Sequence, residues 1–272
     1  MFEQPSRAAG SPPTTRRFDV MTTGLLNGDR AVVLGSLVSI IVLAWSYMLL
    51  LAPTMPVDAM EPNPNPWSAT EFVVMFVMWA VMMVAMMLPS AVPMLLVFAS
   101  VNRARCAAVS RNLKTGAFLI GYLALWAAFS FLATIAQWIL HSAGLVSPHV
   151  VSISPMLSAV LLIVAGLYQF TPFKHACLAR CRTPLGFVLT EWRNGLPGAL
   201  YMGIRHGLFC VGCCWLLMAL LFVAGVMNIL WIAFLAIVIL AEKVVKFGDT
   251  IARAIGVCAF VWGVWLVADF GS

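Results

Sequence analysis

Soft metal ligands gather in one short apolar stretch of the sequence, HGLFCVGCCWLLM at residues 206–218. It holds one imidazole and three thiols, from His206, Cys210, Cys213 and Cys214. Thiolates and thioethers select Cu(I) and other soft ions, whereas Mg²⁺ and Ca²⁺ prefer oxygen ligands. These residue types therefore predict a site for copper, with another soft metal as the alternative.

The spacing of these residues indicates that an α-helix turns them to one side. At about 100° per residue, four ligand-type side chains share a sector of about 80°: Met202, His206, Cys210 and Cys213. Cys214 flanks that sector. An ionisable side chain such as His206 inside a membrane span is itself an indication of function, so we expect this face to point inward.

A second pair of thiols, Cys177 and Cys181, lies in the segment KHACLARCRTP at residues 174–184. An i, i+4 spacing turns both thiols to the same side of a helix. Neighbouring Lys and Arg side chains favour the thiolate, which is the form that binds metal. The CxxxC spacing is not the CxxC of zinc ribbons. We interpret the pair as the place where an ion is first collected.

Methionine thioethers are concentrated in a third segment, EFVVMFVMWAVMMVAMMLPSAVPM at residues 71–94. Met82 and Met86 each lie within about 20° of Met75 on one helical face, and thioethers are soft and polarisable. At about 1.5 Å of rise per residue, Met86 and Cys210 lie at similar depths in a membrane. We expect Met82 and Met86 to be weak, exchangeable ligands if the two helices pack together.

Packing is the alternative role for all of these sulfur atoms. A free cysteine often behaves as a small hydrophobic residue, and a methionine stripe often fills a core. We interpret the single thiols Cys106 and Cys258 in this way. Disulfides are disfavoured, because Cys177 and Cys181 are expected to face a reducing cytoplasm.

The elements that must position these ligands are membrane helices. Of the 272 residues, 62% are hydrophobic and only 10% are charged, against about 25% charged in soluble domains. A spanning helix needs about 20 apolar residues. We therefore expect an all-α, polytopic transmembrane helix bundle of about seven spans, with six as the alternative, and residues 31–270 as a single transmembrane domain. The expected spans are 31–52, 69–100, 115–140, 150–172, 199–226, 228–245 and 250–269.

The distribution of Lys and Arg orients the predicted bundle. Basic residues precede the first span and fill alternate loops, whereas loops 53–68 and 141–149 contain neither Lys nor Arg. The positive-inside rule then makes the N-terminus cytoplasmic, in a bacterial inner membrane. Residues 1–30 are polar and rich in Pro, Gly and Arg, and we expect them to be a disordered cytoplasmic tail rather than a signal peptide.

Local signals refine two of the helices. Ser68 and Glu71 have the spacing of a capping box that opens the second span. Pro89 lies inside that span, where a proline frees a carbonyl and bends the axis. Gly203 and Gly207 form a small-xxx-small pattern, which lets another helix approach closely.

The stretches MWAVMMVAMMLPSAVPM (78–94), YQFTPFKHACLARCRTP (168–184) and GIRHGLFCVGCCWLLM (203–218) carry a resemblance to a known family. They resemble a bacterial family of predicted metal-binding integral membrane proteins, formerly a domain of unknown function and sometimes labelled copper chaperone-like. The resemblance extends over about residues 30–270 and leaves out the N-terminal tail. It implies metal binding through Met and Cys but not a particular reaction.

We therefore expect a membrane-embedded protein that holds or hands on Cu(I), with a soluble delivery or recipient protein as a partner. The alternatives are a metal transporter, a subunit of a membrane redox or metalloenzyme assembly system, and a membrane protein whose thiols only pack. The sequence has no nucleotide-binding loop, nucleophile elbow or zinc-protease motif, so enzymatic activity has no motif in its favour. Its short basic loops hold few aromatic residues, which disfavours nucleic-acid binding.

Overall fold

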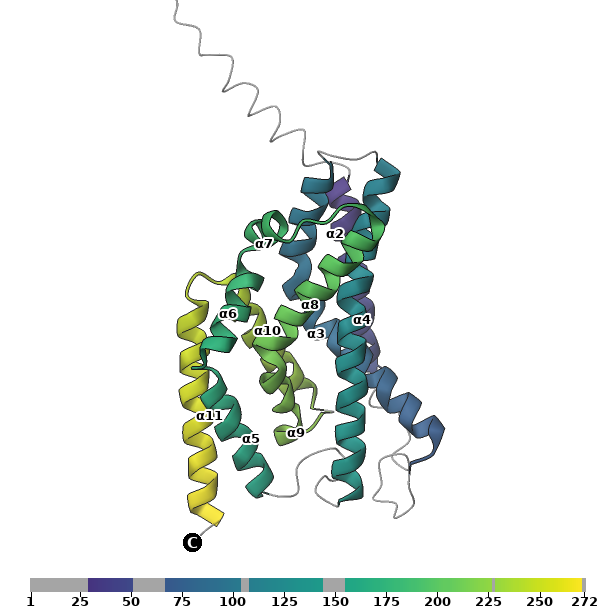
Figure 1. Cartoon of the computed structure of the whole chain (residues 1–272). Helices are drawn as coiled ribbons and strands as arrows, with labels where there is room; N and C mark the ends of the chain where they lie inside the picture. Colours follow the sequence, from purple (N-terminus) through teal and green to yellow (C-terminus); the bar gives the residue numbers. More distant parts are fainter. Residues whose placement is uncertain (1–28, 51–66, 104–107, 144–154, 227, 271–272) are drawn as a thin grey trace, which may run out of the picture.

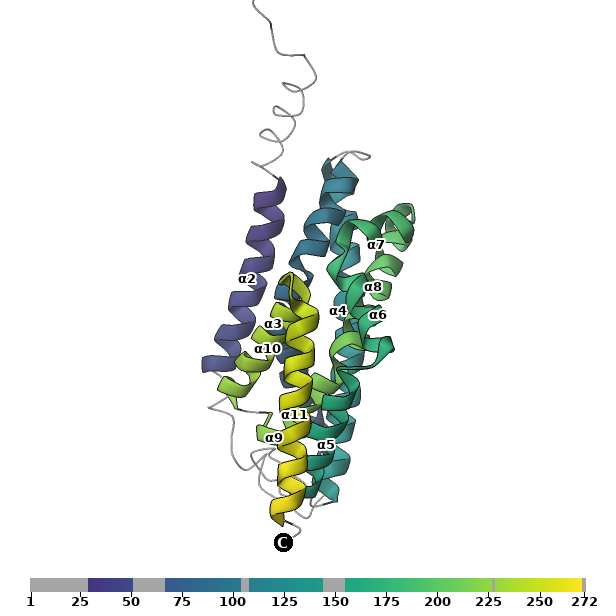
Figure 2. The same ribbon diagram turned by 90° about the vertical axis from the view of Figure 1, so that its left-hand side faces the viewer.

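The computed structural model describes residues 29–50, 67–103, 108–143, 155–226 and 228–270. All regular secondary structure within these residues is helical, in agreement with the predicted class. The helices run roughly along one direction and form an elongated bundle (Figures 1 and 2). The expected tail lies outside the described residues except for its last two positions, and Cys106 lies outside them too.

Ten helices make up the described part of the chain. They are α2 (Asp29–Leu50), α3 (Ala69–Arg103), α4 (Ala108–Ser142), α5 (Pro155–Tyr168), α6 (Pro172–Arg182), α7 (Pro184–Thr190), α8 (Gly195–Ala219), α9 (Leu221–Ala224), α10 (Ile229–Val244) and α11 (Gly248–Phe270). Helix α8 contacts α4 on one side and α6 on another, while α11 runs beside α5 at an edge of the bundle (Figure 1).

The expectation of about seven spans is wrong for the described residues, which hold five helices long and apolar enough to cross a membrane. The number rises to six, the alternative, if α5 and α6 count as one broken span; they are bent by 66°. Helix α10 has only 16 residues, about 24 Å at the usual rise, which is short for a hydrocarbon core of about 30 Å. The orientation of the chain across the membrane stays a prediction.

Helix α3 begins as its sequence indicates and contains Pro89 and Pro93 in its interior. The Ser68 amide donates to Glu71 Oε2 at 2.5 Å and the Glu71 amide donates to Ser68 Oγ at 3.3 Å, which confirms the capping box. Pro89 has no N–H, so the Ala85 carbonyl loses its helical partner. The Trp45 indole of α2 donates to that carbonyl at 3.2 Å, and α2 is thereby attached to α3 one turn before Pro89.

Glycines bring α4 and α8 into backbone contact, as the small-residue pattern predicted. A Cβ atom at Gly203 would collide with the Phe118 carbonyl of α4, and one at Gly207 would lie 2.9 Å from Leu125 Cδ2. The contact is reciprocal, because a Cβ at Gly121 of α4 would overlap the α8 backbone at Leu200. This contact fixes the rotation of α8 and therefore the direction in which its cysteines point.

Polar bonds attach α6 to the turn between α10 and α11. The Arg182 guanidinium lies 2.9 Å from Asp249 Oδ2 and donates to the carbonyls of Val245 and Lys246 at 3.1 and 2.8 Å. His175 Nδ1 lies 3.8 Å from the other oxygen of the Asp249 carboxylate. The second thiol-bearing segment is thus held against the last two helices of the chain.

Candidate metal centre

The ligand face of α8 points into the protein, as its spacing predicted. His206 is 2% exposed, and the thiols of Cys210, Cys213 and Cys214 are equally buried. The close glycine contact between α8 and α4 helps to select this orientation. The burial is a finding, whereas metal binding by these residues stays a prediction.

Four cysteine sulfurs from two helices come together at this face. The Cys181 thiol of α6 is electrostatically coupled to the Cys210 and Cys213 thiols, and Cys214 is coupled to the same two. We refer to Cys181, Cys210, Cys213 and Cys214 as the sulfur cluster. Two thiols also bond to the backbone, because Cys213 and Cys214 donate to the Cys210 carbonyl at 3.0 and 2.9 Å.

Cys177 lies beside the sulfur cluster and packs against the backbone of α8. A Cβ at Gly212 would lie 2.8 Å from the Cys177 sulfur, so only glycine leaves room for this thiol. The Tyr168 hydroxyl donates to the Gly212 carbonyl, which further joins α5 to α8 at this point. Both thiols of α6 therefore turn toward α8, as their i, i+4 spacing predicted.

Helix α3 contributes a thioether, but from a neighbouring position to those predicted. The Cys214 thiol lies 3.9 Å from the sulfur of Met87. Met82 and Met86 are fully buried, yet in the described part of the chain neither is hydrogen-bonded to a thiol. Because α3 is covered on almost every side at this depth, periodicity alone does not distinguish Met86 from Met87.

Two polar side chains next to Cys210 were missed by sequence reasoning. Lys243 Nζ lies 2.9 Å from the Cys210 sulfur and 3.1 Å from Ser90 Oγ. The Tyr122 hydroxyl lies 3.2 Å from the same sulfur and 3.1 Å from the Met87 carbonyl. The expected span 228–245 contains Lys243, but sequence reasoning assigned the residue no role at the site; a lysine in the last turn of an apolar helix was the available signal.

His206 lies among aromatic rings rather than within bonding distance of a thiol. Its ring stacks on Tyr122 with centroids 5.6 Å apart and lies 5.5 Å from Phe187 and 6.0 Å from Phe118. The buried Nδ1 atom of His206 has no hydrogen-bond partner in the described residues. A buried polar atom without a partner is rare, so this nitrogen is free to accept a proton donor or a metal ion.

A buried ion pair lies at the bend between α5 and α6. Lys174 Nζ is 2.7 Å from Glu242 Oε2, and the lysine side chain is 0% exposed. Gln169 accepts from Lys174 and donates to Glu242 at 3.3 Å. Ionisable groups inside a membrane protein are costly and usually functional or paired, and here the pair connects α6 to α10.

The donor chemistry suits a soft ion, although the side chains do not surround one. Among the described residues, no group of three or more His, Cys, Asp or Glu side chains is arranged to hold a metal ion. The thiols of Cys213 and Cys214 both donate to the Cys210 carbonyl. The thioether of Met87 adds a soft donor from a third helix.

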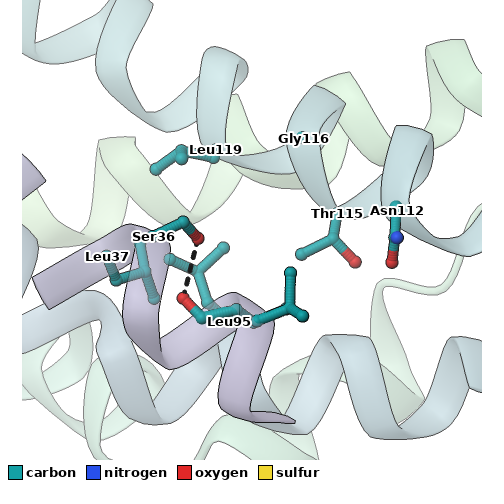
Figure 3. A pocket seen from close by; sticks show the side chains of 9 residues that line it. Ser36, Leu37, Leu95, Asn112, Thr115, Gly116 and Leu119 are labelled. Atoms are coloured by element: carbon teal, nitrogen blue, oxygen red, sulfur yellow. Dashed lines mark hydrogen bonds between the residues drawn. The ribbon is translucent and has the colours of Figure 1, made fainter. Parts of the chain in front are cut away.

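A separate cavity of about 190 Å³ lies between α2, α3 and α4 (Figure 3). Its lining is apolar except for Ser36, Asn112 and Thr115, and the Ser36 hydroxyl donates to Val33 within its own helix. None of the nine lining residues is Cys, Met or His. This cavity therefore offers no soft ligands and is distinct from the sulfur cluster.

The family comparison covers the region that carries these features. A family model described as PpoB2, copper chaperone, matches residues 76–266. The match includes every residue of the sulfur cluster together with Met87, His206 and Lys243. No curated protein and no solved structure gives a match to the chain.

Proposed function

Because the chain belongs to the PpoB2 family of copper chaperones, we propose that it binds Cu(I) as cargo inside the cell membrane and hands it on. The sulfur cluster is the proposed binding site, with Cys210, Cys213 and Cys214 from α8 and Cys181 from α6. Sulfur ligands favour Cu(I) over harder ions. A bacterial inner membrane is the proposed location, in keeping with the long apolar helices.

One observation carries this proposal: α6 and α8 bring their thiols together in the interior. Cys177 of α6 packs against the backbone of α8 at Gly212, and Cys181 is electrostatically coupled to Cys213, which is 32 positions away in the sequence. Cysteines that only fill space do not require such convergence, because any small apolar residue packs as well. The buried setting also protects a bound Cu(I) from water.

The proposed route begins at α6 and ends deeper on α8. Cys181 is partly exposed whereas Cys210 and Cys213 are buried, so Cys181 and the adjacent Cys177 are proposed to receive the ion. Met87 replaces the predicted Met82 and Met86 as the proposed weak ligand, and His206 is proposed to bind only after its ring shifts. A soluble protein that delivers or accepts copper is the proposed partner.

Competition for Cu(I) tests this proposal. Purified protein in detergent is titrated with Cu(I) in the presence of a colorimetric Cu(I) chelator, and a variant carrying Cys210→Ser, Cys213→Ser and Cys214→Ser is compared with it. We expect the triple variant to lose at least about 100-fold in affinity, because soft thiolates are replaced by hydroxyls. Cys258→Ser is the matched control, since this exposed thiol lies on α11 away from the cluster. Equal affinities of wild-type and triple variant would refute the proposal.

Transport across the membrane is a second candidate, favoured by the buried ion pair Lys174–Glu242. Ionisable residues inside membrane proteins often mark ion pathways, and the bent α5–α6 pair resembles the broken helices that line them. Uptake of Cu(I) into sealed proteoliposomes distinguishes the two functions. Accumulation above that of empty liposomes supports transport, and binding without accumulation supports the chaperone function.

A further inference from the structure

The cavity between α2, α3 and α4 is a recess at one end of the bundle, apart from the sulfur cluster (Figure 3). It is lined by residues near the beginnings of α2 and α4 and by Leu95, about two turns before α3 ends. Among the lining residues Val32 is 64% exposed, whereas Leu37 is 2% and Leu95 1% exposed. The cavity is therefore open to the surroundings of the bundle, which around apolar spanning helices are lipid.

The lining of the cavity changes from polar to apolar along α4. Asn112 and Thr115 lie near the start of that helix, and Leu119 lies about 10 Å farther along it than Asn112. Figure 3 shows the two polar side chains at one side of the cavity and Leu37 and Leu119 at the other. A phospholipid has the same order of chemistry, because a polar headgroup at the membrane surface continues into acyl chains in the hydrocarbon core.

The charge at this end of the bundle is positive. Residues 103–114 include four basic and no acidic residues, and the nearest acids on either side in the sequence are Glu71 and Glu191. Arg103 lies in the last turn of α3, and Lys114 belongs to the part of α4 that lines the cavity. Basic pockets between transmembrane helices bind anionic lipid headgroups. The charge therefore favours an anionic lipid over a zwitterionic one.

We infer that this cavity binds one anionic phospholipid, with its headgroup at the polar side and an acyl chain along the leucines. This inference goes beyond the proposed function, because it requires neither copper nor any cysteine. A lipid in this position contacts α2, α3 and α4 together. It stabilises the folded bundle by mass action, as any ligand does that binds the folded state alone.

Gly116 allows the cavity to be filled by a single substitution. The glycine lines the cavity, and a Cβ built on it meets no atom within 4 Å. The side chain of Gly116→Leu takes the space of the acyl chain, so we expect affinity for phosphatidylglycerol to fall at least about tenfold. Gly35→Leu is the matched control, because a Cβ at Gly35 is equally unhindered and this residue does not line the cavity.

Native mass spectrometry of the full-length, delipidated protein in detergent measures the binding. Phosphatidylglycerol or phosphatidylcholine with identical acyl chains is added, and the bound lipid is counted for each variant. We expect the wild-type protein and Gly35→Leu to retain one phosphatidylglycerol in preference to phosphatidylcholine. Gly116→Val, with a smaller side chain, replaces Gly116→Leu if the leucine variant does not fold.

Lys114→Gln tests the headgroup separately from the acyl chain. Loss of one basic residue near the membrane surface should reduce the preference for phosphatidylglycerol about fivefold. Arg253→Gln, which removes an exposed charge from α11, should leave that preference unchanged. Equal binding of the two lipids by the wild-type protein overturns the inference, and so does undiminished binding of phosphatidylglycerol when the cavity is filled at Gly116.

Discussion

The contact between α4 and α8 and the junction between α6 and α10 hold the same sulfur cluster by opposite means. Helices α4 and α8 meet backbone to backbone at Gly121 and Gly203, with no room for a side chain between them. Helices α6 and α10 are joined by the Lys174–Glu242 ion pair, which Gln169 completes. One side is fixed by shape and the other by charge.

This difference indicates which side of the site can move. Packed glycine contacts have few alternative arrangements, because interiors are close-packed. Polar bonds can be exchanged for others when a charged cargo arrives, and buried ionisable groups in membrane proteins commonly take part in function. We therefore regard α8 as the half of the site that is fixed by packing, and α6 with Cys177 and Cys181 as the half that is held by polar bonds.

The largest expected effect comes from leaving one buried charge without its partner. Glu242→Leu strands the Lys174 ammonium in the interior, and breaking a buried pair in this way costs about 3–5 kcal/mol of folding stability. Thermal unfolding in detergent, followed by tryptophan fluorescence, measures this loss.

The double variant Lys174→Met with Glu242→Leu separates charge from packing. Replacing both members of a buried pair by apolar residues is often neutral or stabilising, so stability should return close to that of the wild-type protein. If the double variant is as unstable as Glu242→Leu, the α6–α10 junction is held by packing rather than by charge. The contrast between this junction and the α4–α8 contact would then be wrong.

A smaller loss is expected at the glycine contact. In Gly203→Ala the added Cβ meets the backbone of Phe118, and overpacking of this kind costs about 2–3 kcal/mol. Gly35→Ala is the control, because nothing lies within 4 Å of a Cβ built at that position of α2. The melting temperatures of the two variants in the same detergent provide the test; equal values would contradict a tight α4–α8 contact.

Tyr122→Phe should cost less again. It removes a hydroxyl that bonds to the Met87 carbonyl and touches the Cys210 sulfur, and one hydrogen bond contributes about 1 kcal/mol. We expect a lowered melting temperature and only a small change in Cu(I) affinity. Tyr201→Phe, on the exposed side of α8, controls for loss of a hydroxyl as such. A loss of copper binding as large as that of the triple serine variant would instead make Tyr122 part of the binding site.

The smallest effect is expected where the charges of α6 are exposed to solvent. Asp249→Asn weakens the bond to Arg182, and pairs of this kind contribute about 0.2–1 kcal/mol. The difference from wild type should shrink at high salt, because exposed charges are screened. Unfolding at low and high ionic strength measures both effects. A loss of folding stability that does not depend on salt would indicate that the Arg182–Asp249 pair is shielded from solvent, as the Lys174–Glu242 pair is.

Periodicity and composition predicted the parts of this site that lie within single helices. The inward face with His206, Cys210 and Cys213 followed from 3.6 residues per turn, and the close approach at Gly203 followed from its spacing with Gly207. Both depend only on neighbours in the sequence, and the structure shows both.

Periodicity and composition could not predict the contacts between different helices. Cys181 joins the α8 cysteines only because the chain bends by 66° between α5 and α6, and no local pattern specified that angle. The inward direction of Lys243, at the end of α10, could not be predicted because it depends on Ser90 and Cys210 from distant helices. Periodicity did not distinguish Met87 from Met86, because both are buried at this depth of α3.

X-ray absorption at the copper edge of the Cu(I)-loaded protein tests the central claim most directly, because it reports which atoms bind the ion. We predict a first shell of sulfur in the wild-type protein, which disappears when Cys210, Cys213 and Cys214 are replaced by serine. A first shell of nitrogen and oxygen only, or a sulfur shell that the triple variant retains, would contradict a copper site built on the cysteines of α8.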